Sequence, residues 1–295
     1  MSEQNPGTPE RQSTPFLVLQ FFVFPLSIVA VCVAVFVVFG LIASEGRGAR
    51  DYLAEVRQGG ANRRWQAAFE LAKLLQAGKD PALKDPRFIE ELLLLFRDTK
   101  ADDPRVRRYL ALALGRLGDR QAVPALAEVL RESGPDSDSE TVIFAAWALG
   151  ALGDPAATPE LARAAASGDA GVRKAAVHAL GALPGEAAAA ALRPALEDAA
   201  LDVRWNAALA LGRRRDPAAL PLLAGMLDRD ALERLPEVAP EQRDEALLQA
   251  VAVAAGFADE EIQAALARLR DADPNLRVRD AAREALAARA ARPTP

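Results

Sequence analysis

A short pattern recurs along most of this chain and constrains its fold more than any other feature. It consists of an arginine, usually after valine, followed by a run of alanine and leucine that ends in ALG. The copies are RRWQAAFELAKLL from Arg63, VRRYLALALGRLGD from Val106, TVIFAAWALGALGD from Thr141, VRKAAVHALGALPG from Val172, VRWNAALALGRRRD from Val203, QRDEALLQAVAVA from Gln242 and VRDAAREALAARA from Val278. The spacing of their glycines gives a period of about 31 to 35 residues, and such a period indicates stacked supersecondary units.

Each unit resolves into two helices. The chain is 51% hydrophobic, mostly alanine and leucine, which are strong helix formers. Pro124, Pro159 and Pro221 each stand nine residues after a repeat glycine, and a proline suits the start of a helix. Asp169 is a candidate N-cap. We therefore expect an all-α fold, with second helices beginning near residues 62, 103, 138, 169, 200, 240 and 275.

These units resemble HEAT repeats, especially those of the phycobilisome-lyase-like subgroup, over residues 48–291. The resemblance implies a right-handed α–α superhelix of about seven helix pairs, with the arginine-bearing helices on the concave side. It also implies a ladder of ion pairs between the turn acids and the arginines of neighbouring units. Three acid–arginine pairs keep the expected spacing: Asp198/Arg204, Glu237/Arg243 and Asp273/Arg279. Val142 replaces the arginine in the third unit, so we expect the ladder to be interrupted there.

Residues 16–43 form an uncharged apolar segment, FLVLQFFVFPLSIVAVCVAVFVVFGLIA. At ~1.5 Å per residue, a helix of this length exceeds the ~30 Å hydrocarbon core of a bilayer. A cleaved signal peptide would have a basic start and an apolar core of only ~7–15 residues. We therefore predict a disordered tail at residues 1–15, a transmembrane helix at 16–43 and a solenoid at 44–295.

The basic residues around this segment predict its orientation. Five arginines follow it before residue 65, whereas Arg11 alone precedes it. Basic residues favour the cytoplasmic side, so we expect a single-pass protein of the inner (cytoplasmic) membrane with a cytoplasmic solenoid. The alanine- and arginine-rich composition is typical of a bacterial protein. The reversed topology, with the solenoid on the envelope side, stays open.

The composition also argues against several function classes. The net charge is −5 and no block of Lys and Arg occurs, so we expect no nucleic-acid partner. One cysteine, Cys32, and one histidine, His178, exclude an intrachain disulfide and a Cys-based or multi-His metal site. A lone histidine without an obvious nucleophile or paired acids is a weak catalytic signal. We expect no catalytic residue, cofactor, metal or small-molecule substrate.

The second helices carry unusual side chains on the face predicted to line the groove. With the arginine at position zero and ~100° per residue, positions −1, +3, +4 and +7 share the packed side, whereas +1 and +5 lie opposite. The candidate partner-binding residues at +1 and +5 are Trp65, Phe69, Arg108, Leu112, Trp147, Lys174, His178, Trp205 and Leu209. Exposed aromatic clusters mark interaction sites. Ordinary packing between units is the alternative for Leu112 and Leu209.

These features favour a membrane-anchored, non-catalytic scaffold that binds a protein partner, such as a subunit of a membrane complex, in its groove. A bilin-lyase-like enzyme is an alternative that rests on the repeat subtype alone. An envelope-side assembly factor is a second alternative. A longer connection, DRDALERLPEVAPEQRD at residues 228–244, is either a binding rim or a tolerated surface loop.

Overall fold

The computed structural model describes residues 24–43, 47–134, 136–236 and 238–290, without the side chains of residues 24, 25 and 38–43. The chain forms two compact units, Met1–Arg47 and Gly48–Pro295. The predicted tail, residues 1–15, and the first part of the predicted membrane segment, residues 16–23, lie outside the described residues.

The described part of the first unit contains the helix α2 (Phe24–Ala43), which holds no charged residue. Its large side chains are exposed, with Leu26 at 70% and Phe36 at 80%. An apolar helix with such exposure has no hydrophobic partner among the described residues of its unit.

Across the part of the chain that the structure describes, no helix combines the length and the hydropathy that a membrane span needs.

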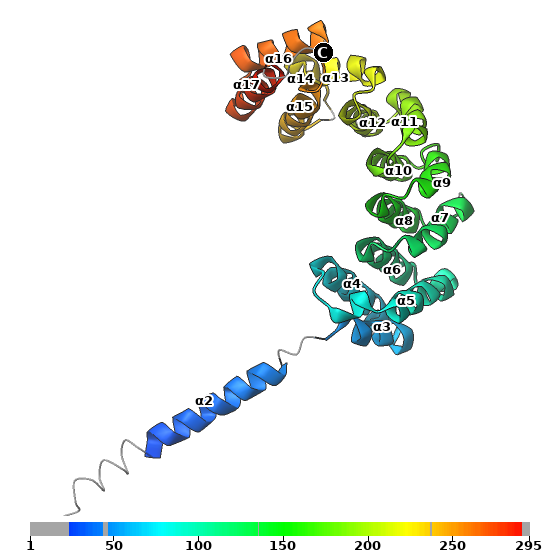
Figure 1. Ribbon diagram of the computed structural model, residues 1–295, viewed down its shortest axis with the longest axis vertical. Coiled ribbons are helices and arrows are strands. Elements are labelled where there is room, and N and C mark those ends of the chain that lie inside the picture. The colour runs from blue at the N-terminus through cyan, green and yellow to red at the C-terminus, as the bar shows by residue number, and fades with distance from the viewer. Residues whose placement is uncertain (1–23, 44–46, 135, 237, 291–295) are drawn as a thin grey trace, which may run out of the picture. The chain divides into compact units, whose positions relative to one another are not determined.

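The second unit is built from successive helix pairs (Figure 1). The first helices are α3 (Ala49–Gln58), α5 (Pro86–Asp98), α7 (Val123–Glu132), α9 (Thr158–Ala164), α11 (Glu186–Leu192), α13 (Leu220–Met226) and α16 (Glu260–Ala272). The second helices are α4 (Ala61–Ala77), α6 (Pro104–Leu117), α8 (Ser139–Leu152), α10 (Ala170–Ala182), α12 (Leu201–Arg213), α15 (Pro240–Ala254) and α17 (Leu276–Ala290). Each second helix begins within one residue of its predicted start. The all-α repeat architecture is therefore confirmed.

Short 3-10 helices introduce or extend several of the first helices. They are η2 (Pro81–Lys84), η3 (Thr99–Ala101), η4 (Arg120–Ala122), η5 (Pro155–Ala157), η6 (Arg193–Glu197) and η7 (Pro217–Ala219). The turns before η4 and η5 share one mechanism. Gly118 and Gly153 end their helices in the left-handed conformation, with φ of 77° and 62°. Asp119 and Asp154 then accept a backbone N–H two residues on, at 2.8 and 2.9 Å. The Gly-Asp dipeptide thus ends one helix and caps the next turn.

Neighbouring second helices pack directly on one another, from α4 through α17. In Figure 1, α6, α8, α10 and α12 line the inner side of the arc formed by this unit, and α5, α7, α9 and α11 line its outer side. The repeat glycines make this packing close. A Cβ atom added at Gly115 would lie 2.7 Å from Cα of Ala148, and one at Gly150 would lie 2.9 Å from Cα of Ala179. The glycine of each ALG triplet therefore faces the next second helix.

The ion-pair ladder joins the arginine of one unit to the turn acid of the next. Arg173 donates to the Asp198 carboxylate at 2.7 and 2.9 Å, and also to the carbonyl oxygen of Ser167 in its own turn at 3.0 Å. Arg64 pairs with Asp102 in the same way. Arg204, which follows Asp198 in the same unit, donates to the backbone oxygen of Asp198 at 2.6 Å.

The longer connection supplies the last contact of this ladder. It contains the short helix α14 (Arg229–Glu233). Arg229 donates to the Asp273 carboxylate at 2.9 and 2.7 Å and to Asp244 at 2.7 Å. The Asp273 side chain is fully buried, so its charge depends on this arginine. Asp273 thus pairs with Arg229 rather than with Arg243, the repeat arginine of the preceding unit, which donates to the Leu235 carbonyl oxygen at 3.1 Å. Glu237 lies outside the described residues.

We predict that Gly115→Ala destabilises the second unit by about 1–3 kcal/mol, because the new methyl group would overlap backbone atoms of α8. Gly225→Ala is the matched control. Gly225 also lies in a helix, but a Cβ atom there meets open space, so this change should be neutral or stabilising by up to about 1 kcal/mol. Urea unfolding followed by circular dichroism measures both. Equal midpoints for the two variants would contradict the close-packing role.

We also predict an acid-dependent effect of Asp198→Asn. The Arg173 guanidinium holds the pKa of Asp198 below its ordinary value. Since the folded-state pKa lies below the unfolded one, the pair stabilises the fold at neutral pH, and this contribution is lost as the pH falls below about 4. The variant should lose about 2 kcal/mol at pH 7 and match the parent chain near pH 2. Asp271→Asn, at an exposed pair with Arg270, should change nothing measurable.

Candidate functional site

Five aromatic side chains form a continuous row across α4, α6 and α8. The Tyr109 ring lies at its centre, with its centroid 6.4 Å from that of Trp65, 5.2 Å from that of Phe69 and 6.0 Å from that of Phe144. Phe144 continues the row to Trp147 at 5.3 Å. These separations are typical of interacting rings. We call this set the aromatic row.

The aromatic row is half-buried along its length and exposed near its ends. Trp147 is 46% exposed and Phe69 is 38% exposed. Trp65, Tyr109 and Phe144 are partly buried and pack against the hydrophobic core. The Trp65 Nε1 atom is buried and has no hydrogen-bond partner. The two exposed rings, Phe69 and Trp147, contact Tyr109 and Phe144, which in turn pack against the core. Such contacts restrict the motion of the exposed rings, and a rigid surface loses less entropy on binding.

Cationic side chains cover the α4 end of the aromatic row. The Arg105 guanidinium lies 5.1 Å from the centre of the Trp65 ring, and the Lys73 ammonium lies 5.6 Å from that of Phe69. Both distances fall in the range of cation–π contacts. The Trp147 end has no such cover among the described contacts, so its ring is the more accessible one.

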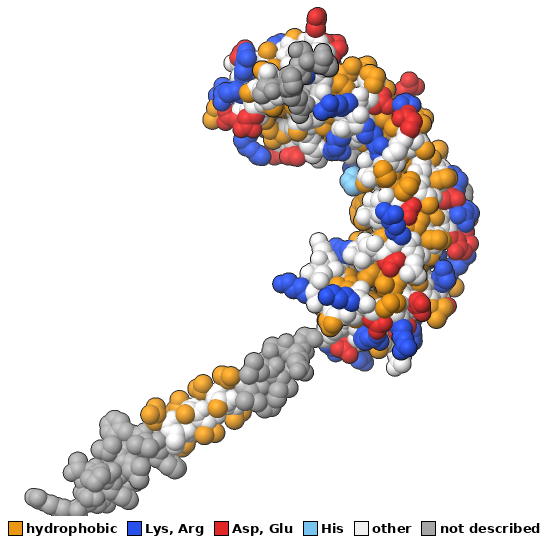
Figure 2. All heavy atoms as spheres, in the orientation of Figure 1, with side chains coloured by type: hydrophobic (Ala, Val, Ile, Leu, Met, Phe, Trp, Pro, Cys, Tyr) orange, Lys and Arg blue, Asp and Glu red, His pale blue; other side chains and the backbone are white. Residues whose placement is uncertain are grey.

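A surface pocket of 690 Å³ adjoins Trp147 between α8, α10 and α12. We call it the Trp147 pocket. It is lined by Ile143, Trp147, Gly150, Ala151, Gly171, Lys174, Ala175, His178, Ala182 and Asn206. In Figure 2 the pale-blue histidine, the only one of the chain, lies at the inner edge of the arc beside hydrophobic side chains. Trp147, Lys174 and His178, three residues predicted for the groove, thus meet in one place.

The two cations predicted for the groove are engaged with the next unit. Arg108 donates to Asp138 and Glu140 at the start of α8. This contact holds the Arg108 pKa above its ordinary value, chiefly through the hydrogen bond to Asp138. Lys174 lies 2.8 Å from the Asp202 carboxylate of α12. The charge of Arg108 is therefore neutralised by acids of the next unit. The Lys174–Asp202 pair is half-exposed, so an acidic group of a ligand can compete with Asp202 for Lys174.

The remaining predicted groove residues differ in exposure. Leu209 is only 5% exposed, so its expected place on the open face is wrong, and packing between units is the correct interpretation. Leu112, Trp65 and Trp205 are half-buried against the core. The helices α6 and α12 each pack between two neighbouring second helices, and α4 packs against α3 and α6. The neighbours cover part of the face that appears open when one helix is considered alone.

Tyr109 and Phe144 connect the two exposed ends of the aromatic row but were not among the residues predicted for the groove. Both stand at position +2 of their units, outside the positions assigned to the groove. A signal was available, because two successive units place an aromatic residue at this same position. In the fold, position +2 directs each ring toward its neighbours on the adjacent second helices.

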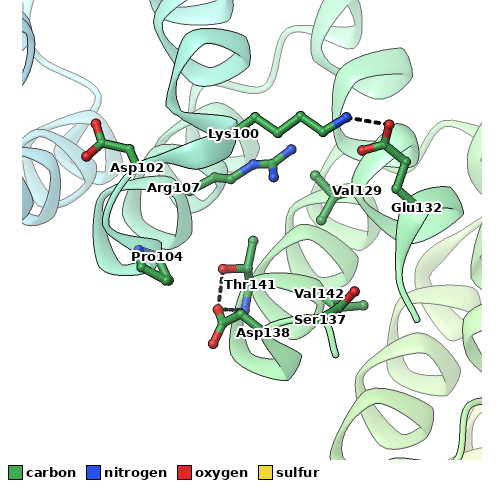
Figure 3. Close-up of a pocket in the computed structure, with 10 residues that line it drawn as sticks. All are labelled: Lys100, Asp102, Pro104, Arg107, Val129, Glu132, Ser137, Asp138, Thr141 and Val142. Carbon is green, nitrogen blue, oxygen red and sulfur yellow. Dashed lines mark hydrogen bonds and ion pairs between the residues drawn. The ribbon is translucent and has the colours of Figure 1, made fainter. Parts of the chain in front are cut away.

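A second cavity of 600 Å³ lies on the turn side of α6 and α8 (Figure 3). Arg107 and Lys100 project into it, and Lys100 contacts Glu132 at 2.5 Å. The Arg107 Nε atom is buried and has no hydrogen-bond partner, and burial lowers the pKa of its guanidinium. Val142, the residue that replaces an arginine, is buried in the wall of this cavity. The side chains that line this cavity include both basic and acidic residues.

Neither cavity has a recognisable catalytic set. Within residues 24–43, 47–134, 136–236 and 238–290, no group of three or more His, Cys, Asp or Glu side chains is placed to hold a metal ion. The Trp147 pocket offers His178, Lys174 and Asn206 as polar groups, and its lining includes no carboxylate. The arrangement suits binding through an apolar contact and hydrogen-bond donors.

Solved structures similar to this chain include two repeat proteins. The structure of the complex of CpcE and CpcF of phycocyanin lyase from Nostoc sp. PCC7120 is 24% identical, with a TM-score of 0.52. The match covers 83% of this chain and 97% of that chain. The archaeal HEAT-like repeats protein from Thermococcus onnurineus NA1 is 15% identical, with a TM-score of 0.48 and coverage of 84% and 98%. The first likeness shows the fold alone. No curated protein matches the sequence.

The sequence also matches a family model described as HEAT repeats. The matches cover residues 89–180, 135–203 and 164–239. Together they span more than half of the chain. They include α6, α8, α10 and α12, which carry the Trp147 pocket and the aromatic row from Tyr109 to Trp147, whereas α4 with Trp65 and Phe69 precedes them. The chain belongs to the HEAT-repeat family.

Proposed function

We propose that this chain is a membrane-anchored, non-catalytic scaffold that binds a protein partner on the face lined by its second helices. The observation that carries the proposal is Trp147, an exposed indole at the end of the aromatic row and beside an apolar pocket. Exposed apolar clusters of this kind mark interaction sites, and tryptophan is enriched among binding hot spots. The remaining rings hold Trp147 in place, which lowers the entropic cost of binding.

The repeat architecture supports a binding role. HEAT-type solenoids create extended concave surfaces, and a partner that follows such a surface can contact several units at once. Here the aromatic row spans three successive second helices, and the Trp147 pocket extends to the next two. A continuous surface of this length suits a protein segment better than a small molecule.

The apolar N-terminal segment supports membrane anchoring. Residues 16–43 contain no charge, and α2 leaves its large apolar side chains exposed. The arginines that follow this segment favour the inner membrane with the solenoid in the cytoplasm. Anchoring would raise the local concentration of the solenoid for a partner in the same bilayer, so we propose a subunit of a membrane complex.

A lyase-like activity is the weaker alternative. The likeness to the phycocyanin lyase complex is a likeness of fold, and function depends on the site rather than on the fold. The Trp147 pocket has no cysteine or carboxylate in its lining that would serve as a nucleophile or an acid–base pair. An apolar pocket beside an exposed indole suits side-chain recognition better than bond formation.

We predict that a photo-crosslinking amino acid at Trp147 captures a partner of discrete mass in native membranes. The matched control is Leu94, which is 54% exposed on the outer helix α5. The same partner should be captured from His178, and Trp147→Ala should reduce that capture because loss of a hot-spot indole costs about 2 kcal/mol of binding free energy. Equal capture from Leu94, or undiminished capture in the Trp147→Ala chain, would contradict a docking site on this face.

We predict that the full chain stays with the membrane pellet after an alkaline carbonate wash, whereas residues 48–295 stay in the supernatant. The physical reason is the uncharged segment 16–43. Alkaline phosphatase fused to the C-terminus should be inactive, because the enzyme needs export. An active fusion would place the solenoid on the envelope side and support the reversed topology.

A further inference from the structure

The Trp147 pocket has a floor of small residues. We give this name to the five glycines and alanines among its ten lining residues, Gly150, Ala151, Gly171, Ala175 and Ala182. A Cβ atom placed at Gly171 would lie 3.1 Å from Oδ1 of Asp169 and 3.2 Å from Cδ1 of Ile143, so the glycine keeps this part of the lining free of a side chain. The small lining residues leave a pocket of 690 Å³, which has room for a bulky apolar side chain from outside that would stack on the exposed face of Trp147.

The polar groups of the pocket are hydrogen-bond donors or can become donors. Lys174 and His178 are exposed on α10, and Lys174 keeps further N–H groups beside its contact with Asp202 at 2.8 Å. Asn206 donates its amide to the Asp202 carbonyl oxygen at 2.7 Å. No carboxylate lines the pocket, and Asp202 stands at its border, half-exposed. The lining is thus complementary to a carboxylate brought by a ligand.

We propose that the Trp147 pocket binds a protein segment that presents a bulky apolar side chain with a carboxylate close beside it. The apolar side chain lies on the floor of small residues against Trp147, and the carboxylate accepts hydrogen bonds from Lys174 and His178. This proposal rests on the docking function proposed above and adds the chemistry of the partner. The aromatic row beyond Phe144 then provides contact area along the rest of the segment.

Synthetic peptides test the proposal directly. The probes are three fluorescein-labelled peptides of the same length that carry Phe-Glu, Phe-Gln or Ser-Glu at their centre, titrated with the full chain in detergent. Fluorescence anisotropy should show the Phe-Glu peptide binding about tenfold more tightly than either twin, since each twin lacks one charged hydrogen bond or one buried ring. The imidazole proton signals of His178, unambiguous in a chain with one histidine, should shift most with the Phe-Glu peptide.

Variants separate the two contacts. The double change Lys174→Gln and His178→Gln should remove the difference between the Phe-Glu and Phe-Gln peptides, and Trp147→Ala should weaken both. Lys79→Gln, at an exposed site on another part of the chain, is the control and should change neither. All four positions are exposed, so the folded state should persist, and circular dichroism checks this.

Two results would overturn this inference and distinguish it from the broader function. If the Phe-Glu and Phe-Gln peptides bind equally and both depend on Trp147, recognition of an acid is wrong while docking on this face stands. If no peptide binds, the stated partner chemistry is wrong. Crosslinking from Trp147 then decides the docking function, because failure of that capture as well would refute both proposals.

Discussion

The second helices α6, α8, α10 and α12 meet with glycine against alanine, and the arrangement of the groove depends on this contact. A Cβ atom at Gly115 or Gly150 would overlap the backbone of the following helix. The missing side chains let the helix axes approach more closely than leucine contacts would permit. The rings of Tyr109 on α6 and Phe144 on α8 are consequently near enough to touch. This part of the aromatic row is thus a result of the same small residues that define the repeat, whereas α4, whose rings also contact Tyr109, has Ala72 at the equivalent position.

The repeat pattern predicted the helices well because its signals are local. Arginine, alanine and glycine recur at fixed intervals, and the starts of the second helices follow from them within one residue. Placing side chains on the groove was less successful. Phe69, Trp147 and His178 at position +5 are exposed, whereas Leu209 at the same position is buried. A projection of one helix contains no information about how closely the next unit covers its flank. That coverage depends on tertiary packing, which differs along the stack.

The ion pairs show a second limit of local reasoning. The spacing within one unit links Asp198 with Arg204, but the side chain that reaches Asp198 is Arg173 of the preceding unit. The partner of Asp273 is Arg229, which comes from the longer connection and lies 44 residues away in sequence. Such a pairing forms because a buried carboxylate requires a cation, and the nearest arginine in space satisfies it. The connection that looked like a surface loop or a binding rim therefore helps to join the last units.

The distribution of charge along the stack supports the proposal that a partner binds near Trp147. At position +1, Arg108 and Lys174 both contact acids of the following helix, so these charges primarily hold units together. The Lys174–Asp202 pair is exposed enough for a ligand to compete, whereas Arg108 is mostly covered. Toward the C-terminus, position +1 becomes acidic, and Asp244 is taken up by Arg229 and Asn275. An exposed ring, an unfilled apolar pocket and accessible donors therefore coincide at α8 and α10. Under the proposed function, a partner at this point of the groove would compete for one exposed ion pair, Lys174–Asp202, and would leave the more buried pairs of the stack intact.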